Sequence, residues 1–234
     1  MILVVATDFD NLKEYLLSTY KIINETISIF NTEAYLVKTN NKEVLFLKAN
    51  CTNVLLTLQI QRLLNNYPIT SIIGIGNTAT THNSIKLNDI AVVTSSFEYD
   101  VNFTALGYPF NFIPALQTIY CNCNQEYIKQ VLAITSSFPN QTHLGIIGSS
   151  NQFIASNYCC KQIKCKTKID FIDTESAPIN EIAFLYNLPS VIVKGISNHA
   201  SNNATNEYLC NKEKSNNLSF TVAINLIEQL TLQN

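Results

Sequence analysis

Four side chains suited to chemistry follow short apolar runs of this sequence. They are Asp10, Glu175 and the neighbours Asn198 and His199. A carboxylate accepts hydrogen bonds from hydroxyl groups, and an imidazole titrates near neutral pH. A carboxamide donates and accepts hydrogen bonds, but it has no proton to transfer at accessible cost. These residue types suit the binding of a polar small molecule, with His199 as a possible acid.

The elements that must position these side chains alternate along the chain. Strand-length apolar runs cover residues 2–6, 43–48, 71–75, 89–93, 145–147, 168–172 and 190–193. Segments with helical spacing cover residues 10–20, 54–66, 124–137, 176–186 and 215–232. This order predicts an α/β fold, with a mostly parallel mixed central sheet sandwiched between helices and a ligand site at the carboxyl ends of the strands. The length of 234 residues, 47% of them hydrophobic, predicts a single domain over residues 1–234.

Composition excludes several other classes of protein. A formal net charge of −2 and 14% charged residues leave no basic field for a nucleic acid. The N-terminal apolar stretch is about five residues long, too short for a signal peptide or a membrane span, so we expect a cytoplasmic protein with no membrane contact. Seven scattered cysteines and three histidines, without a paired CxxC, predict no metal site, and we expect no cofactor.

Five segments together resemble a known family. They are SIIGIGNTATTHNSIKLNDIAVV (71–93), YDVNFTALGYPFNFIP (99–114), NQFI (151–154), DTESA (173–177) and VKGISN (193–198). In order and spacing they are similar to motifs of the methylthioadenosine/S-adenosylhomocysteine nucleosidases, within the nucleoside phosphorylase superfamily. The resemblance runs nearly end to end. It implies a purine nucleoside as the partner molecule and hydrolysis of its N-glycosidic bond as the reaction.

The resemblance also implies roles for individual residues. Glu175 and the adjacent Thr174 would bind the ribose, and Phe153 and Ile154 would bind the base. The loop lining the site would contain Gly76, Asn77 and Thr78, and the segment that a partner subunit contributes near the 5′ substituent would contain Tyr108, Phe112 and Pro114. A two-fold homodimer follows from that last segment. Plainer readings remain open: Glu175 as a helix N-terminal residue, Phe153 as a core aromatic, and Tyr108 and Phe112 as dimer core without ligand contact.

The sequence departs from the family at the catalytic positions. Asn198 stands where the family has the aspartic acid that protonates the leaving purine, so leaving-group activation should be severely weakened. Asp10 matches the glutamate that positions the water, although an acid in the first turn of a helix is an equal interpretation. His199 could replace the missing acid, but we expect it to point away from the site. Lys194 replaces an arginine, and we expect it to form a salt bridge.

Three hypotheses follow from this pattern. The first is a nucleosidase-like protein that binds a purine nucleoside and hydrolyses it poorly or not at all. The second is an active N-ribosyl hydrolase with 6-oxopurine specificity, similar to futalosine hydrolases, because the amide of Asn198 can both donate to and accept from such a base. The third is a non-catalytic structural or interaction protein with a closed pocket.

Overall fold

The computed structural model describes residues 1–7, 9–38, 42–49 and 52–232, so Asn50 and Cys51 of the loop before the second helix lie outside the described residues. The strands are β1 (Ile2–Thr7), β2 (Glu25–Ile29), β3 (Thr32–Lys38), β4 (Glu43–Ala49), β5 (Ser71–Thr80), β6 (Ile90–Glu98), β7 (Cys121–Asn122), β8 (Thr142–Ser149), β9 (Phe171–Asp173) and β10 (Ser190–His199). The helices are α1 (Leu12–Tyr20), α2 (Asn53–Asn66), α3 (Gln125–Thr135), α4 (Asn157–Lys166), α5 (Ser176–Leu185) and α6 (Ala204–Leu232), with a 3₁₀ turn η1 (Thr104–Leu106).

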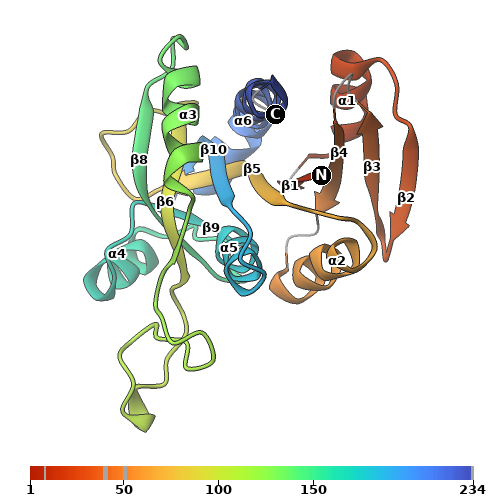
Figure 1. The fold of residues 1–234 in the computed structure, drawn as a ribbon. Coiled ribbons are helices and arrows are strands. Elements are labelled where there is room, and N and C mark those ends of the chain that lie inside the picture. The colour runs from red at the N-terminus through yellow and green to blue at the C-terminus, as the bar shows by residue number, and fades with distance from the viewer. Residues whose placement is uncertain (8, 39–41, 50–51, 233–234) are drawn as a thin grey trace.

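The strands form one mixed sheet in the order β10, β6, β8, β9, β5, β1, β4, β3, β2 (Figure 1). Strand β10 also pairs with β5, so one end of the sheet closes on itself. Strands β4, β1, β5 and β10 pair in parallel, whereas the β2–β3 hairpin adds an antiparallel edge. The predicted α/β fold with a mixed sheet and helices on both sides is confirmed.

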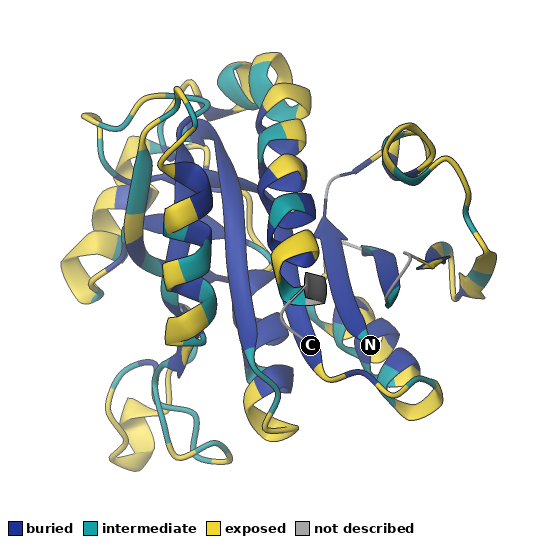
Figure 2. Cartoon of the chain, turned by 45° about the horizontal axis from the view of Figure 1, so that its top comes forward, coloured by how far each residue is buried: buried dark blue, intermediate teal, exposed yellow. Residues whose placement is uncertain are grey.

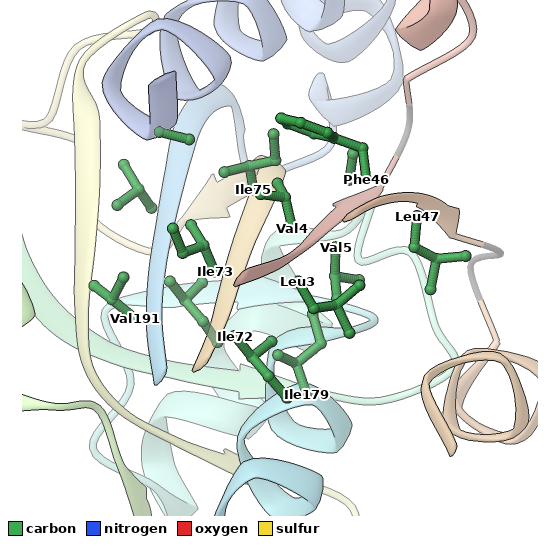
Figure 3. Close-up of a cluster of buried hydrophobic side chains, with 14 of the residues drawn as sticks. Leu3, Val4, Val5, Phe46, Leu47, Ile72, Ile73, Ile75, Ile179 and Val191 are labelled. Carbon is green, nitrogen blue, oxygen red and sulfur yellow. The ribbon is translucent and has the colours of Figure 1, made fainter. Parts of the chain in front are cut away.

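The central strands are buried on both faces because helices cover the sheet from two sides (Figure 2). Strand β1 has every side chain buried, as its unbroken apolar run predicts. Alternate residues turn to opposite faces: Leu3 lies toward Ile179 of α5, and Val4 lies on the side of Phe46 (Figure 3). Phe46 in turn contacts Phe220 of α6, with ring centroids 6.4 Å apart. No helix among the described residues is long and apolar enough to cross a membrane.

Strands β5 and β10 continue well past their apolar runs. The apolar runs end at residues 75 and 193, and residues 76–78 are expected in a loop, but the two strands pair with each other as far as Thr80 and His199. The register shifts between Ile196 and Asn198, which is a β-bulge of the kind that re-aims side chains next to binding sites. Helix α6 packs closely here, because a Cβ at Gly195 would lie 2.1 Å from the Ser215 carbonyl oxygen.

Candidate functional site

A cavity of about 220 Å³ lies at the carboxyl ends of β5, β9 and β10. This is the edge of the sheet where the alternation of strands and helices predicts a ligand site. The residues that line it are Asn77, Thr78, Ala79, Gln152, Phe153, Ile154, Ile172, Asp173, Thr174, Glu175, Ser197, Asn198 and Tyr208. The structure therefore brings together the residues predicted for ribose, for base and for proton transfer.

Glu175 is the most strongly bonded acid of the cavity. It stands at the N-terminus of α5 and is 3% exposed. Its Oε1 accepts hydrogen bonds from Thr7 Oγ1 and Lys194 Nζ, each at 2.6 Å. Its Oε2 accepts from the backbone nitrogen and the hydroxyl of Thr174, at 2.9 and 2.6 Å. Burial alone would raise the pKa of Glu175, but the charge and hydrogen bond of Lys194, with the hydroxyl donors, lower it. The lowered pKa favours the ionised carboxylate, which already accepts these four hydrogen bonds.

Lys194 is fully buried and joins two carboxylates. Its Nζ lies 2.6 Å from Glu175 Oε1 and 3.3 Å from Asp173 Oδ2, so the predicted salt bridge is confirmed. Gly76 makes room for this cluster: its φ is +144°, and a Cβ there would lie 2.2 Å from Thr7 Oγ1. Gly76 was predicted to line the cavity, but its role in the structure is to clear space behind the carboxylate.

Asp173 belongs to the same cluster and was missed in the sequence. Its carboxylate accepts from Ser149 Oγ at 2.6 Å and from the hydroxyl and backbone nitrogen of Ser176, the first residue of α5. Asp173 thereby satisfies a backbone N–H that has no partner within the helix. Burial and the nearby charge of Glu175 raise the pKa of Asp173, against the lowering effect of Lys194. An acid directly after the apolar run of β9 was the signal that could have identified it.

Asn198 lies at the bulge of β10 and is 2% exposed. Its Oδ1 accepts from Ser197 Oγ at 2.8 Å, and its Nδ2 donates to the His199 carbonyl oxygen at 3.1 Å. The imidazole of His199 turns away: Nδ1 faces Glu207 Oε2 at 3.2 Å, and Nε2 faces the Ile85 carbonyl oxygen at 3.1 Å. His199 therefore does not line the cavity, as expected from its position next to Asn198 on the strand.

Two aromatic rings form an exposed wall of the cavity. Phe153 is 53% exposed, too open for a core aromatic, and its ring meets the Tyr208 ring edge-on with centroids 5.6 Å apart. Ile154 beside it is buried. Tyr208 comes from α6 and was not foreseen, because the sequence predicted that this helix begins at Ser215. An exposed ring face beside polar groups can stack on a planar base.

Polar side chains of β5 complete the wall. Asn77 Oδ1 accepts from Ser215 Oγ at 2.5 Å, and Thr78 Oγ1 donates to the Ile172 carbonyl oxygen at 3.0 Å. Both residues were predicted to line the site, and the structure places both in the cavity wall. An open cavity lies between Phe153 and Glu175. The structure therefore gives no support to the hypothesis of a non-catalytic protein with a closed pocket.

Other predicted residues lie outside the cavity. The carboxylate of Asp10 is 75% exposed and pairs with Lys212 Nζ at 3.0 Å, so the structure does not bring it to the site as a water-positioning acid. Tyr108 and Phe112 stack on each other, with centroids 5.6 Å apart, on the segment that protrudes between β6 and β7 together with Pro114 (Figure 1). None of these three residues lines the cavity of the same chain.

Comparison with known proteins agrees with this geometry. The family model described as the phosphorylase superfamily matches residues 2–228. A 5′-methylthioadenosine/S-adenosylhomocysteine nucleosidase of Buchnera aphidicola from Schizaphis graminum is 32% identical over 139 residues, which is 58% of each chain. The nucleosidase of Buchnera aphidicola from Baizongia pistaciae is 28% identical over 95% of this chain and 84% of its own. An aminodeoxyfutalosine nucleosidase of Helicobacter pylori is 22% identical over 82% of each chain.

Solved structures show the same fold. A Helicobacter pylori 5′-methylthioadenosine/S-adenosylhomocysteine nucleosidase complexed with a substituted pyrrolidin-3-ol superimposes with a TM-score of 0.91 at 18% identity, over 98% of both chains. An aspartate-to-asparagine mutant of the Helicobacter pylori nucleosidase, with 5′-methylthioadenosine in its active site, gives 0.90 at 19% identity over 97% of this chain and 98% of that one. The chain belongs to the phosphorylase superfamily, and within it is similar to the methylthioadenosine/S-adenosylhomocysteine nucleosidases.

Proposed function

We propose that this chain binds a purine nucleoside in the cavity at the ends of β5, β9 and β10, and that its hydrolysis of the N-glycosidic bond is weakened or lost. The observation that carries the proposal is the meeting of Glu175, Asn198 and the open face of Phe153 in one cavity. An ionised carboxylate suits the ribose hydroxyls, and an exposed ring suits the base.

The weakened hydrolysis follows from the groups that the cavity contains. A purine leaves as an anion unless a proton reaches it, and the amide of Asn198 has none to give. The side chains that could compensate point elsewhere, since His199 faces Glu207 and Asp10 faces Lys212. The aspartate-to-asparagine mutant of the Helicobacter pylori nucleosidase supports retained binding, because that protein still holds 5′-methylthioadenosine in its active site.

A panel of nucleosides tests the proposal. Methylthioadenosine, S-adenosylhomocysteine, adenosine, inosine and futalosine are each titrated calorimetrically, and released base is quantified over a long incubation. We expect measurable binding of at least one nucleoside, with release close to that of a protein-free control. Glu175→Gln should weaken that binding roughly 10-fold or more, since a charged acceptor of the sugar is lost. Glu126→Gln, at an exposed acid of α3, is the matched control and should change nothing.

Two results would contradict the proposal. If the folded protein bound none of the nucleosides, purine nucleosides would be ruled out as its ligands. Rapid release of adenine would show that another group supplies the proton.

Release of base from inosine or futalosine alone would favour the second candidate, an active hydrolase of 6-oxopurine nucleosides. The amide of Asn198 favours that candidate, because it can donate to O6 and accept from a protonated ring nitrogen.

The proposal extends to a homodimer. Phe103, Leu106 and Tyr108 are exposed on the protruding segment, and further apolar side chains are exposed on α2 and α5 at the same lower side of Figure 1. Exposed apolar side chains gathered on one side of the molecule suit a self-complementary interface. We also propose that the protein works in the cytoplasm, since the six cysteines among the described residues are free thiols.

Light scattering tests the dimer. We expect a mass twice the 26.2 kDa of the chain. Leu106→Glu should shift the protein toward the monomer, because it places a charge in the proposed interface. Leu209→Glu changes another exposed leucine, on α6, and should leave the mass unchanged. A wild-type mass of 26.2 kDa at every concentration would rule the dimer out.

A further inference from the structure

The acceptor positions of Glu175 are already filled by this chain. A carboxylate offers about four lone-pair sites, two on each oxygen. Thr7 Oγ1 and Lys194 Nζ occupy Oε1, each at 2.6 Å. The backbone nitrogen and the hydroxyl of Thr174 occupy Oε2, at 2.9 and 2.6 Å. A ligand hydroxyl that is to bind this carboxylate must displace one of the four donors.

Three of these donors are poorly placed to leave. Thr7 and Lys194 are fully buried, and Lys194 also neutralises Asp173. Withdrawing the lysine would leave two buried charges unpaired. The third donor is the backbone nitrogen of Thr174, which cannot move without the chain. The hydroxyl of Thr174 differs, because it belongs to a partly exposed residue of the cavity wall and leaves Oε2 by rotation about one bond.

We infer that Thr174 is a specificity-determining residue whose hydroxyl competes with a sugar hydroxyl for Glu175 Oε2. This inference rests on the proposed function, since it presumes that the cavity holds a nucleoside. The threonine makes a charge-assisted hydrogen bond to Glu175 at 2.6 Å, and the ribose must replace it. The site therefore binds ribosides less tightly than its carboxylate would allow. Ligands without hydroxyl groups at the 2′ and 3′ positions do not meet this competition.

The test compares three proteins: wild type, Thr174→Val and Thr174→Ser. Valine keeps the branched shape but has no donor, and serine keeps the donor. The probes are adenosine and inosine, their 2′,3′-dideoxy forms, and the free bases adenine and hypoxanthine, each titrated calorimetrically. We expect Thr174→Val to bind the better riboside about 10-fold tighter than wild type. Its affinities for the dideoxynucleoside and the free base should stay unchanged, and Thr174→Ser should behave as wild type.

The pattern of affinities separates failure of this inference from failure of the proposed function. The inference would be overturned if Thr174→Val bound ribosides no more tightly than wild type. It would also be overturned if the affinity of Thr174→Val rose equally for the dideoxy forms. The second pattern would mean that valine merely reshapes the cavity. Failure of all six probes to bind wild type and both variants, with unchanged Tm, would refute the nucleoside proposal itself and the inference with it.

Discussion

Replacing Lys194 with methionine should lower the free energy of unfolding by about 3–5 kcal/mol at pH 8, or roughly 6–20 °C in Tm. The lysine is fully buried, 2.6 Å from Glu175 and 3.3 Å from Asp173. Methionine fills a similar volume without the charge. The loss therefore arises mainly from two carboxylates left in a buried site without a cation, and thermal unfolding followed by circular dichroism measures it.

The dependence on pH distinguishes this charge effect from a packing defect. In wild type, Lys194 holds the pKa of Glu175 below its ordinary value, so the stability that Glu175 contributes is lost only as the pH falls through that lowered pKa. Without the lysine, burial raises the pKa of both carboxylates above their unfolded values. The variant should then regain stability as the pH falls from 8 toward 5, because the native state binds protons.

Lys129→Met is the control for removal of a lysine. Lys129 pairs with Glu126 at 3.8 Å on the exposed face of α3, where an ion pair is worth ~0–1 kcal/mol. Lys194→Met would contradict the assignment of Lys194 as the counter-ion of the site if it lost as little stability as this control. The same holds if its loss of stability were equal at pH 5 and pH 8.

The buried strands could be predicted because their apolar runs are nearly continuous, and most of the elements missed bury few side chains. Strand β3 is the exception, since residues 34–37 are buried. The hairpin of β2 and β3 lies at the edge of the sheet, and β2 buries only Ile29. Helix α4 buries only Cys160 among its ten residues, so it has no apolar stripe to reveal it. Elements that pack on one side of an already formed sheet leave a weak periodic signal.

The site residues were predictable by type, whereas the direction of the side chain was predictable for His199 but not for Asp10. Glu175 and Asn198 follow apolar runs, and the cavity contains both. The direction of the Asn198 side chain depends on the pairing of β5 with β10 and on the bulge after Ile196. Neither feature can be recognised from the sequence of a single strand. The partners that draw His199 and Asp10 away are Glu207 and Lys212. Both belong to the first turns of α6, which lack the apolar spacing of its later part.

Replacing Asn198 with aspartate should raise the release of base from an adenine nucleoside by about 10²–10⁴-fold, the usual contribution of a positioned general acid. The cavity is suited to a protonated carboxyl at this position. Nδ2 of Asn198 donates to the His199 carbonyl oxygen at 3.1 Å, so an aspartate oxygen in its place would face an acceptor. Only the protonated form can donate there, and burial favours the same form. The structure thus retains the surroundings of a proton donor around a residue that has no proton to donate.

Asn77→Asp is the matched control, since it introduces the same carboxyl elsewhere in the wall of the same cavity. A gain specific to Asn198→Asp, measured as adenine released per enzyme under saturating nucleoside, would identify the missing acid as the step that limits wild type. Equal gains in both variants would mean that any acid in the cavity suffices. No gain in Asn198→Asp, with nucleoside binding intact, would mean that the site also lacks an activated water. That result is expected if Asp10 stays paired with Lys212 when the nucleoside is bound. A loss of hypoxanthine release in the same variant would instead show that Asn198 selects a 6-oxopurine and that the aspartate is ionised at this position, because an ionised carboxylate, unlike the amide, cannot donate to O6.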